Sequence, residues 1–339
     1  MMCVVYVDDT IFGARTSREL EVEITSLGIS TKDHDHTFIL RNEGSVSAFL
    51  GIQIEKLCNQ QFSLTQTGLI DKILLATGLE DCNGCHTPVT AGSMGIDEKG
   101  ENFDDNWEYA SIIGMLLYLA NNTRPDIAYG VHQAARFTHN PKNSHAAGVK
   151  RIIRYLKQTR TKGLFLKPSS TYTVDCYVDS DFAGLFSSED KTLPISVKSR
   201  TGYVIFFRDA PLMWVSKLQT QIALSTMEAE YIALSQAMRD LIPIREIIKE
   251  VLIEVFKTNP TILYSTYSKA FEDVTEQNTN LHVIPQSTVY EDNAACLKFA
   301  QLPRITPRTK HIGIPYHWFR SQVEELQIVI QKIGELTIN

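Results

Sequence analysis

The sequence has no long apolar run, few cysteines and no excess of basic residues, and each absence excludes a class of protein. No stretch approaches the roughly 20 apolar residues of a membrane-spanning helix, and no basic segment precedes an apolar one at the start. Six cysteines in 339 residues do not make a disulfide framework. A formal net charge of −6 gives no overall attraction to nucleic acid. We therefore expect an intracellular protein, in cytoplasm or nucleus and off the membrane, that meets any polyanion through local basic patches.

The residues that are present predict a folded α/β (α+β) protein. Hydrophobic residues make up 43% of the chain and charged residues 21%, which is typical of globular proteins. Strand patterns dominate the start, helical periodicity follows from about residue 108, and strands and helices mix after about residue 172. We place the parts at residues 1–60, 61–105, 106–170 and 171–339, with an insertion at about 258–285.

Two adjacent aspartates, Asp8 and Asp9, lie between two apolar runs near the start. The runs predict a hairpin that is buried on both faces, with the aspartates at its turn. Hard divalent cations prefer carboxylate oxygens, so the pair is a candidate metal site. A solvated turn is the alternative, because aspartate is common in turns.

Three later carboxylates end or begin separate predicted elements. Asp179 ends an alternating strand, Glu228 lies in the first turn of a helix, and Asp292 ends a second strand. Such residues can meet at one point and hold two magnesium ions. The alternatives remain open: Glu228 fits a capping box with Ser225, Asp292 fits a helix N-cap, and Asp179 fits a solvated turn with Asp181.

Basic side chains form two candidate patches for nucleic-acid backbone. One lies on a single face of the helix predicted near residue 150, where a solvated face is the alternative: Lys150, Arg154 and Lys157. The second lies in a proline-broken loop after Asp292: Arg308, Lys310 and His311.

The motifs resemble, in order and spacing, the Pol polyproteins of copia-type retrotransposons. The resemblance covers nearly the whole chain and rests on YVDD at 6–9, FLGIQIE at 49–55, YASIIGMLLYLANNTRPDIAYG at 109–130, YVDSDFAG at 177–184, STMEAEYIAL at 225–234 and DNAACLKFA at 292–300. It implies a partial reverse-transcriptase palm, a thumb-like helix with linker, a helical connection, and a ribonuclease H-like mixed sheet with flanking helices in residues 171–339.

The resemblance also implies an activity, cofactors and site residues. Asp179, Glu228 and Asp292 take the metal-ligand role, with two Mg²⁺ (or Mn²⁺) ions, in hydrolysis of the RNA strand of an RNA–DNA hybrid. Asp8 and Asp9 belong to a polymerase site. The rest of the Pol polyprotein is the implied partner.

Departures from the family weaken the implied activity. The polymerase needs a further aspartate from an earlier strand, so we expect no polymerase activity from this chain alone. The family continues past the last strand to a fourth acidic ligand, and Gly313 stands where it usually has aspartate. A catalytically dead nucleic-acid-binding remnant is therefore the alternative.

A haem-attachment pattern, C-x-x-C-H, occurs at Cys82, Cys85 and His86. Covalent haem usually implies an exported chain, and the resemblance to the copia-type sequences continues through this loop. We expect no haem.

Overall fold

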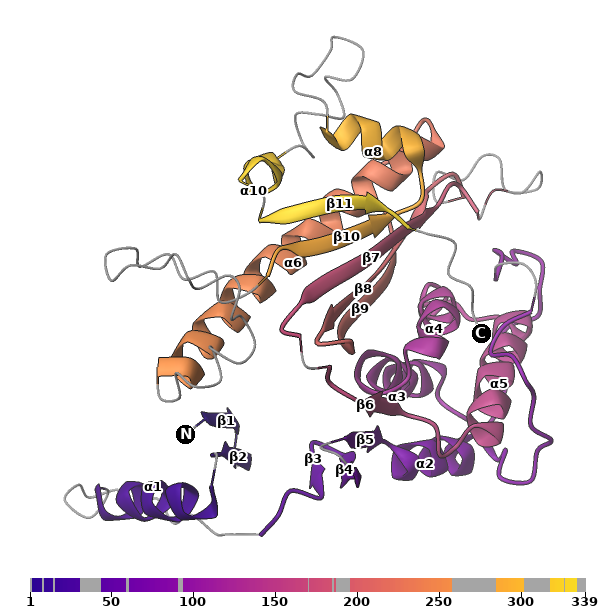
Figure 1. Ribbon diagram of the computed structural model, residues 1–339. Helices are drawn as coiled ribbons and strands as arrows, with labels where there is room; N and C mark the ends of the chain where they lie inside the picture. The colour runs from indigo at the N-terminus through magenta and orange to yellow at the C-terminus, as the bar shows by residue number, and fades with distance from the viewer. Residues whose placement is uncertain are drawn as a thin grey trace.

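The computed structural model describes residues 2–7, 9–14, 16–30, 44–58, 61–90, 94–169, 171–184, 186, 196–257, 285–301, 318–325 and 327–333. It contains a hairpin with one helix, a helical unit with a small sheet, and a five-stranded sheet backed by a long helix (Figure 1). The mixed α/β class predicted from the sequence is confirmed. The insertion expected at about 258–285 lies outside the described residues except for its last position.

The N-terminal strands form the expected hairpin. Strand β1 (Met2–Tyr6) pairs antiparallel with β2 (Asp9–Gly13), and helix α1 (Ser17–Ser30) follows. The expectation that this hairpin is buried is wrong, because Val5 is 65% exposed and Val7 is 81% exposed. In the described part of the chain the two strands form a sheet of their own, so their apolar side chains have no second layer to cover them.

The second unit is built on a core of packed helices. Its helices are α2 (Thr67–Thr77), α3 (Tyr109–Asn122), the 3₁₀ helix η2 (Pro125–Ile127), α4 (Ala128–Ala135) and α5 (Asn143–Gln158). Apolar residues of these helices, including Ile73, Leu116 and Ile152, are fully buried. Helix α2 ends at Gly78, whose φ of +62° favours glycine.

A four-stranded antiparallel sheet borders these helices. It has the order β3 (Ala48–Phe49), β4 (Ile52–Lys56), β5 (Phe62–Thr65) and β6 (Leu164–Leu166). Strand β6 follows α5 in the chain and pairs with β5. This pairing joins residues on either side of the boundary placed at residue 105, and the boundaries stay predictions.

The C-terminal unit is a mixed sheet with the order β11-β10-β7-β8-β9. The strands are β7 (Val174–Asp181), β8 (Arg200–Phe207), β9 (Ala210–Leu218), β10 (Ser287–Glu291) and β11 (Ile328–Lys332). The first three pair antiparallel, whereas β10 runs parallel to both β7 and β11. Since parallel strands end at the same edge, residues that follow β7 and β10 are brought together.

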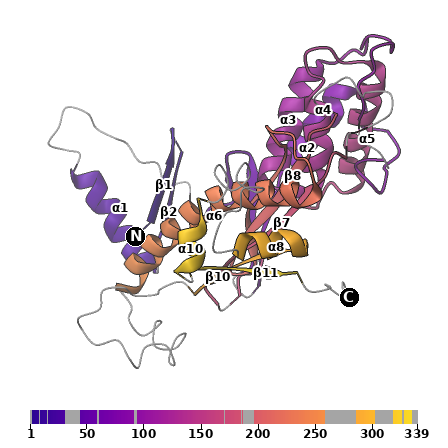
Figure 2. The same cartoon turned by 90° about the horizontal axis from the view of Figure 1, so that it is seen from above.

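One face of this sheet is covered by helix α6 (Thr226–Lys257), with α8 (Ala294–Gln301) and α10 (Arg320–Glu324) beside it (Figure 2). Val174, Cys176 and Val178 of β7 are buried, as the sequence alternation predicts. The residues between them, including Tyr177 and Asp179, therefore belong to the opposite face.

The helical unit contacts the C-terminal sheet at strands β8 and β9. The indole Nε1 of Trp214 donates to the carbonyl of Ala120 at 2.7 Å, and the Arg200 guanidinium lies 5.2 Å from the Tyr129 ring centroid. Within the described ranges, no helix combines the length and apolar character needed to cross a membrane.

Candidate metal centre

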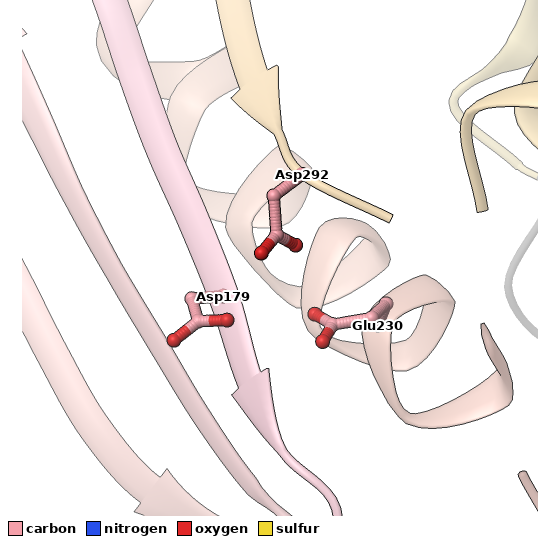
Figure 3. A group of neighbouring side chains, drawn as sticks. All are labelled: Asp179, Glu230 and Asp292. Atoms are coloured by element: carbon pink, nitrogen blue, oxygen red, sulfur yellow. The ribbon is translucent and has the colours of Figure 1, made fainter. Parts of the chain in front are cut away.

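Three carboxylates converge at one edge of the C-terminal sheet. Asp179, Glu230 and Asp292 each offer one oxygen, and these oxygens all lie within 4.8 Å of one another. Figure 3 shows the three side chains directed toward a common point from a strand, a helix and the end of a second strand. The structure thus brings Asp179 and Asp292 together, and their role as metal ligands stays a prediction.

Strand register explains this convergence. Val289 lies opposite Cys176 and Tyr290 opposite Tyr177, so two residues further along Asp292 comes beside Asp179. Helix α6 packs against β7 and β8 and carries Glu230 to the same place. Three segments far apart in the sequence are needed to build the site.

Burial divides the three carboxylates. Asp179 and Asp292 are exposed, whereas Glu230 is only 6% exposed. Burial raises the pKa of Glu230 to about 9, and the nearby charges of Glu291, Asp179 and Asp292 act in the same direction. Its Oε2 has no hydrogen-bond partner among the described residues. A buried acceptor without a donor beside two more carboxylates fits a hard divalent cation, for which carboxylate oxygens are the preferred ligands.

Glu228 does not join this set, and the sequence assignment is corrected to Glu230. The amide of Leu224 donates to Glu228 Oε2 at 2.9 Å, and the amide of Glu228 donates to Ser225 Oγ at 3.2 Å. Glu228 therefore stabilises the start of α6 in a variant of the capping box, the alternative left open from the sequence.

A sequence signal for Glu230 did exist. It is the one charged residue in the stretch from Ala229 to Leu234, where every other residue is apolar. Such a residue faces the protein interior and needs a reason to be there. The capping-box pattern pointed to the other glutamate instead.

Asp292 is free of the capping role that was its alternative. The side-chain Oδ1 of Asn293 accepts the amides of Ala295 and Cys296, each at 3.0 Å, and so caps α8. Asp181, the alternative to Asp179, lies at the end of β7 and is not part of the cluster.

Of the two aspartates of the first hairpin, the structure describes only Asp9, which joins no cluster of carboxylates among the described residues. Asp9 is exposed and lies opposite Tyr6. Asp8 lies outside the described residues. Their role in a polymerase site stays a prediction.

The basic face of α5 is occupied by contacts within the chain. Lys150 pairs with Asp105 at 2.8 Å, Arg154 Nε donates to the Asn83 carbonyl at 2.7 Å, and Lys157 donates to the Cys82 carbonyl at 2.6 Å. These side chains hold the 80–105 loop against the helix. Their contact with nucleic acid stays a prediction, and the second patch (Arg308, Lys310 and His311) lies outside the described residues.

The cysteines of the C-x-x-C-H pattern belong to the same loop. Cys82 and Cys85 are free thiols. The Cys85 thiol donates to the Arg151 carbonyl at 3.3 Å, and its amide donates to the Arg154 carbonyl at 3.4 Å. These contacts give Cys85 a structural role in packing the loop on α5.

Comparison with known proteins gives relatives across nearly the whole chain. The chain is 29% identical over 322 residues to the retrovirus-related Pol polyprotein from transposon RE1 of Arabidopsis thaliana, which covers 94% of this chain. It is 28% identical over 312 residues to that from transposon TNT 1-94 of Nicotiana tabacum. An uncharacterized mitochondrial protein of Arabidopsis thaliana is 31% identical over 241 residues, which make up 93% of that protein. No protein-family model and no solved structure matches.

Fold and site together define a mixed α/β protein with a candidate divalent-metal centre built from carboxylates. The relatives make this more specific: the chain belongs to the retrovirus-related Pol polyproteins of copia-type transposons, of which it is a fragment. It spans about a fifth of the length of the two transposon polyproteins, 19% for RE1 and 20% for TNT 1-94.

Proposed function

We propose that this retrotransposon fragment hydrolyses the RNA strand of RNA–DNA hybrids in a reaction that depends on Mg²⁺ or Mn²⁺. The single observation that carries the proposal is the set of Asp179, Glu230 and Asp292, with ligand oxygens within 4.8 Å of one another. The mixed sheet with α6 on one face, and the resemblance of residues 177–300 to the family's ribonuclease H motifs, support the same activity.

The three carboxylates have different positions in the proposed site. Asp179 and Asp292 are exposed and lie where a backbone phosphate can approach, whereas Glu230 lies beneath them. When bound, the divalent metal supplies activation of the attacking water and stabilisation of the departing ribose oxygen. The carboxylates orient that metal and offset its charge. Since no further carboxylate of the described residues joins Asp9 in a cluster, we propose no polymerase activity for this chain alone.

The test is cleavage of a hybrid with labelled RNA in the presence of Mg²⁺. Wild type is compared with Asp179→Asn and Glu230→Gln, and Glu228→Gln is the matched control on the same helix. Loss of a ligand should cost more than about 100-fold in rate, because changing a residue that only holds a metal ligand in place already costs about 10–100-fold. Glu228→Gln should cleave at the wild-type rate once folded.

Other outcomes overturn the proposal. Equal cleavage by wild type and Glu230→Gln would mean a contaminating nuclease or another site. A folded wild type that binds the hybrid and leaves it intact would favour the catalytically dead remnant.

A further inference from the structure

A fourth carboxylate lies behind the three that converge at the sheet edge. Glu291 is the last residue of β10, and its side chain is 0% exposed. It shares the buried face of that strand with Ser287 and Val289, the face toward α6. Asp292, the next residue, is exposed. The chain therefore presents one carboxylate on each side of the sheet at the same edge.

Three buried side-chain oxygens of this region have no hydrogen-bond partner among the described residues. Glu291 Oε1 accepts the Asn293 amide at 3.1 Å, but its Oε2 has no partner within the described part of the chain. The same holds for Glu230 Oε2 and for Ser180 Oγ. Ser180 lies two residues after Val178 on β7 and so shares its face, and the charge of Glu291 contributes to the raised pKa of Glu230. Both glutamates are more than nine-tenths buried.

The chemistry of these atoms points to a cation. A carboxylate only accepts hydrogen bonds, so two buried carboxylates cannot satisfy one another while both are charged. No lysine or arginine of the described ranges forms an ion pair with either glutamate. The nearby Cys296 thiol stays protonated, because burial and the two glutamates raise its pKa. A hard divalent cation binds several oxygen ligands at once, so it can bind these unpartnered oxygens and offset the charge of both carboxylates.

We propose that Glu291 is a further cation-holding residue of the centre, which binds the divalent metal jointly with Glu230 through its inner oxygen. This inference rests on the proposed function, since it adds a ligand to the same centre. The competing explanation is structural: Glu291 only fixes the turn into α8 through the Asn293 amide. Glu291→Gln separates the two, because the amide oxygen of glutamine still accepts the Asn293 amide and only the charge is lost.

The experiment measures Mn²⁺ binding to the full chain by electron paramagnetic resonance, with the metal alone as probe. We expect Glu291→Gln to weaken Mn²⁺ affinity at least about tenfold, in the range known for residues that support metal ligands. Glu228→Gln, outside the centre, should bind as wild type does. Urea unfolding without metal should show that Glu291→Gln is no less stable than wild type.

The other possible results of the Mn²⁺ binding experiment each overturn a particular claim. If Glu230→Gln weakens binding and Glu291→Gln binds as tightly as wild type, this inference fails and the centre of the proposed function stands. If folded wild type binds no Mn²⁺, both fail. If Glu291→Gln does not fold, Glu291→Met replaces it, because methionine has a similar length and no charge. The same tenfold loss of Mn²⁺ affinity is expected. Unchanged affinity would overturn the inference.

Discussion

Glu228 and Glu230 lie two residues apart at the start of α6 and have opposite environments. Glu228 accepts the Leu224 amide at 2.9 Å at the helix terminus, whereas Glu230 is buried and shares a site with Asp179 and Asp292. Two residues on a helix are separated by about 200° around its axis, so they cannot face the same partner.

This difference predicts opposite effects on stability in metal-free protein. Glu228→Ala removes the acceptor of the Leu224 amide at the start of α6 and should lower the free energy of unfolding by about 0.5–1.5 kcal/mol. Glu230→Gln removes a buried carboxyl from a cluster of like charges and should raise it at pH 8. Urea unfolding with a chelator present measures both. A loss of stability in both variants would contradict the assigned environments.

The pH dependence of stability follows from the same cluster. In the folded chain, burial is the main cause that raises the pKa of Glu230 to about 9. Burial also raises the pKa of Glu291 to about 7. Between the ordinary carboxyl pKa near 4.5 and these values, the unfolded chain has lost protons that the folded chain keeps. Stability therefore falls as pH rises from 5, with both groups acting up to about pH 7 and Glu230 alone up to about pH 9.

The slope sets the size of this effect. One group that titrates only in the unfolded state contributes up to about 1.4 kcal/mol per pH unit. Urea unfolding at pH 5, 6, 7 and 8 without divalent metal measures the decline, and the double variant Glu230→Gln with Glu291→Gln is the control that should flatten it. Stability that is constant or rises over this range in wild type would show that these carboxyls are not buried as described.

Local signals in the sequence predicted much of this fold. The alternation of Val174, Cys176 and Val178 predicted β7, and its end predicted the position of Asp179. Asp292 followed from the same reasoning at a second strand. Both are features of adjacent residues, which a single sequence displays directly.

What the sequence did not predict depends on contacts between distant residues. The choice between Glu228 and Glu230 needs the rotation of α6 against β7. The basic face of α5 appeared free because its partners, the Cys82 carbonyl and Asp105, lie 75 and 45 residues away. The hairpin of residues 2–13 was expected to be buried from its apolar side chains alone, yet burial also requires a second layer.

An ion pair in the helical unit joins a buried arginine, Arg124, to Asp126, whose side chain is 36% exposed. Arg124 is 1% exposed and donates to both Asp126 oxygens, at 2.9 and 2.8 Å, and Tyr155 donates to Asp126 at 2.7 Å. Burial opposes the charged form, but the hydrogen bonds from Arg124 and Tyr155 prevail and lower the pKa of Asp126. Asp126→Asn leaves the arginine charge buried without a counterion.

We expect Asp126→Asn to lower the free energy of unfolding by about 2 kcal/mol, less than for a fully buried pair, because the Asp126 side chain is 36% exposed and Arg124 keeps its bonds to Thr159. Asp71→Asn is the matched control, because it breaks an arginine–aspartate pair with Arg160 that is exposed on both sides. It should cost no more than about 1 kcal/mol. Because the pKa of Asp126 is depressed, its contribution is present above the ordinary carboxyl pKa and is lost as pH falls through the lowered value. Equal effects of the two substitutions in urea unfolding would contradict the role of Asp126 as counterion to a buried arginine.

The contacts of Lys157 give a last prediction, which separates a structural role from nucleic-acid binding. Its ammonium donates to the carbonyls of Glu80 and Cys82, so Lys157→Met should release the loop that follows α2. Hydrogen bonds from charged groups contribute about 1.5–3 kcal/mol, and partial exposure places the expected loss of stability at the lower end. Limited proteolysis should then cut more rapidly within residues 79–90.

Lys72→Met is the control for loss of one positive charge, because Lys72 is exposed on α2 and away from that loop. Affinity for an RNA–DNA hybrid, and its dependence on salt, should be the same for Lys157→Met and Lys72→Met. A lysine that contacts phosphate contributes about one unit to the slope of log affinity against log salt. A slope reduced by that amount only in Lys157→Met, with stability and proteolysis unchanged, would mean that the helix face binds nucleic acid and that the loop contacts are incidental.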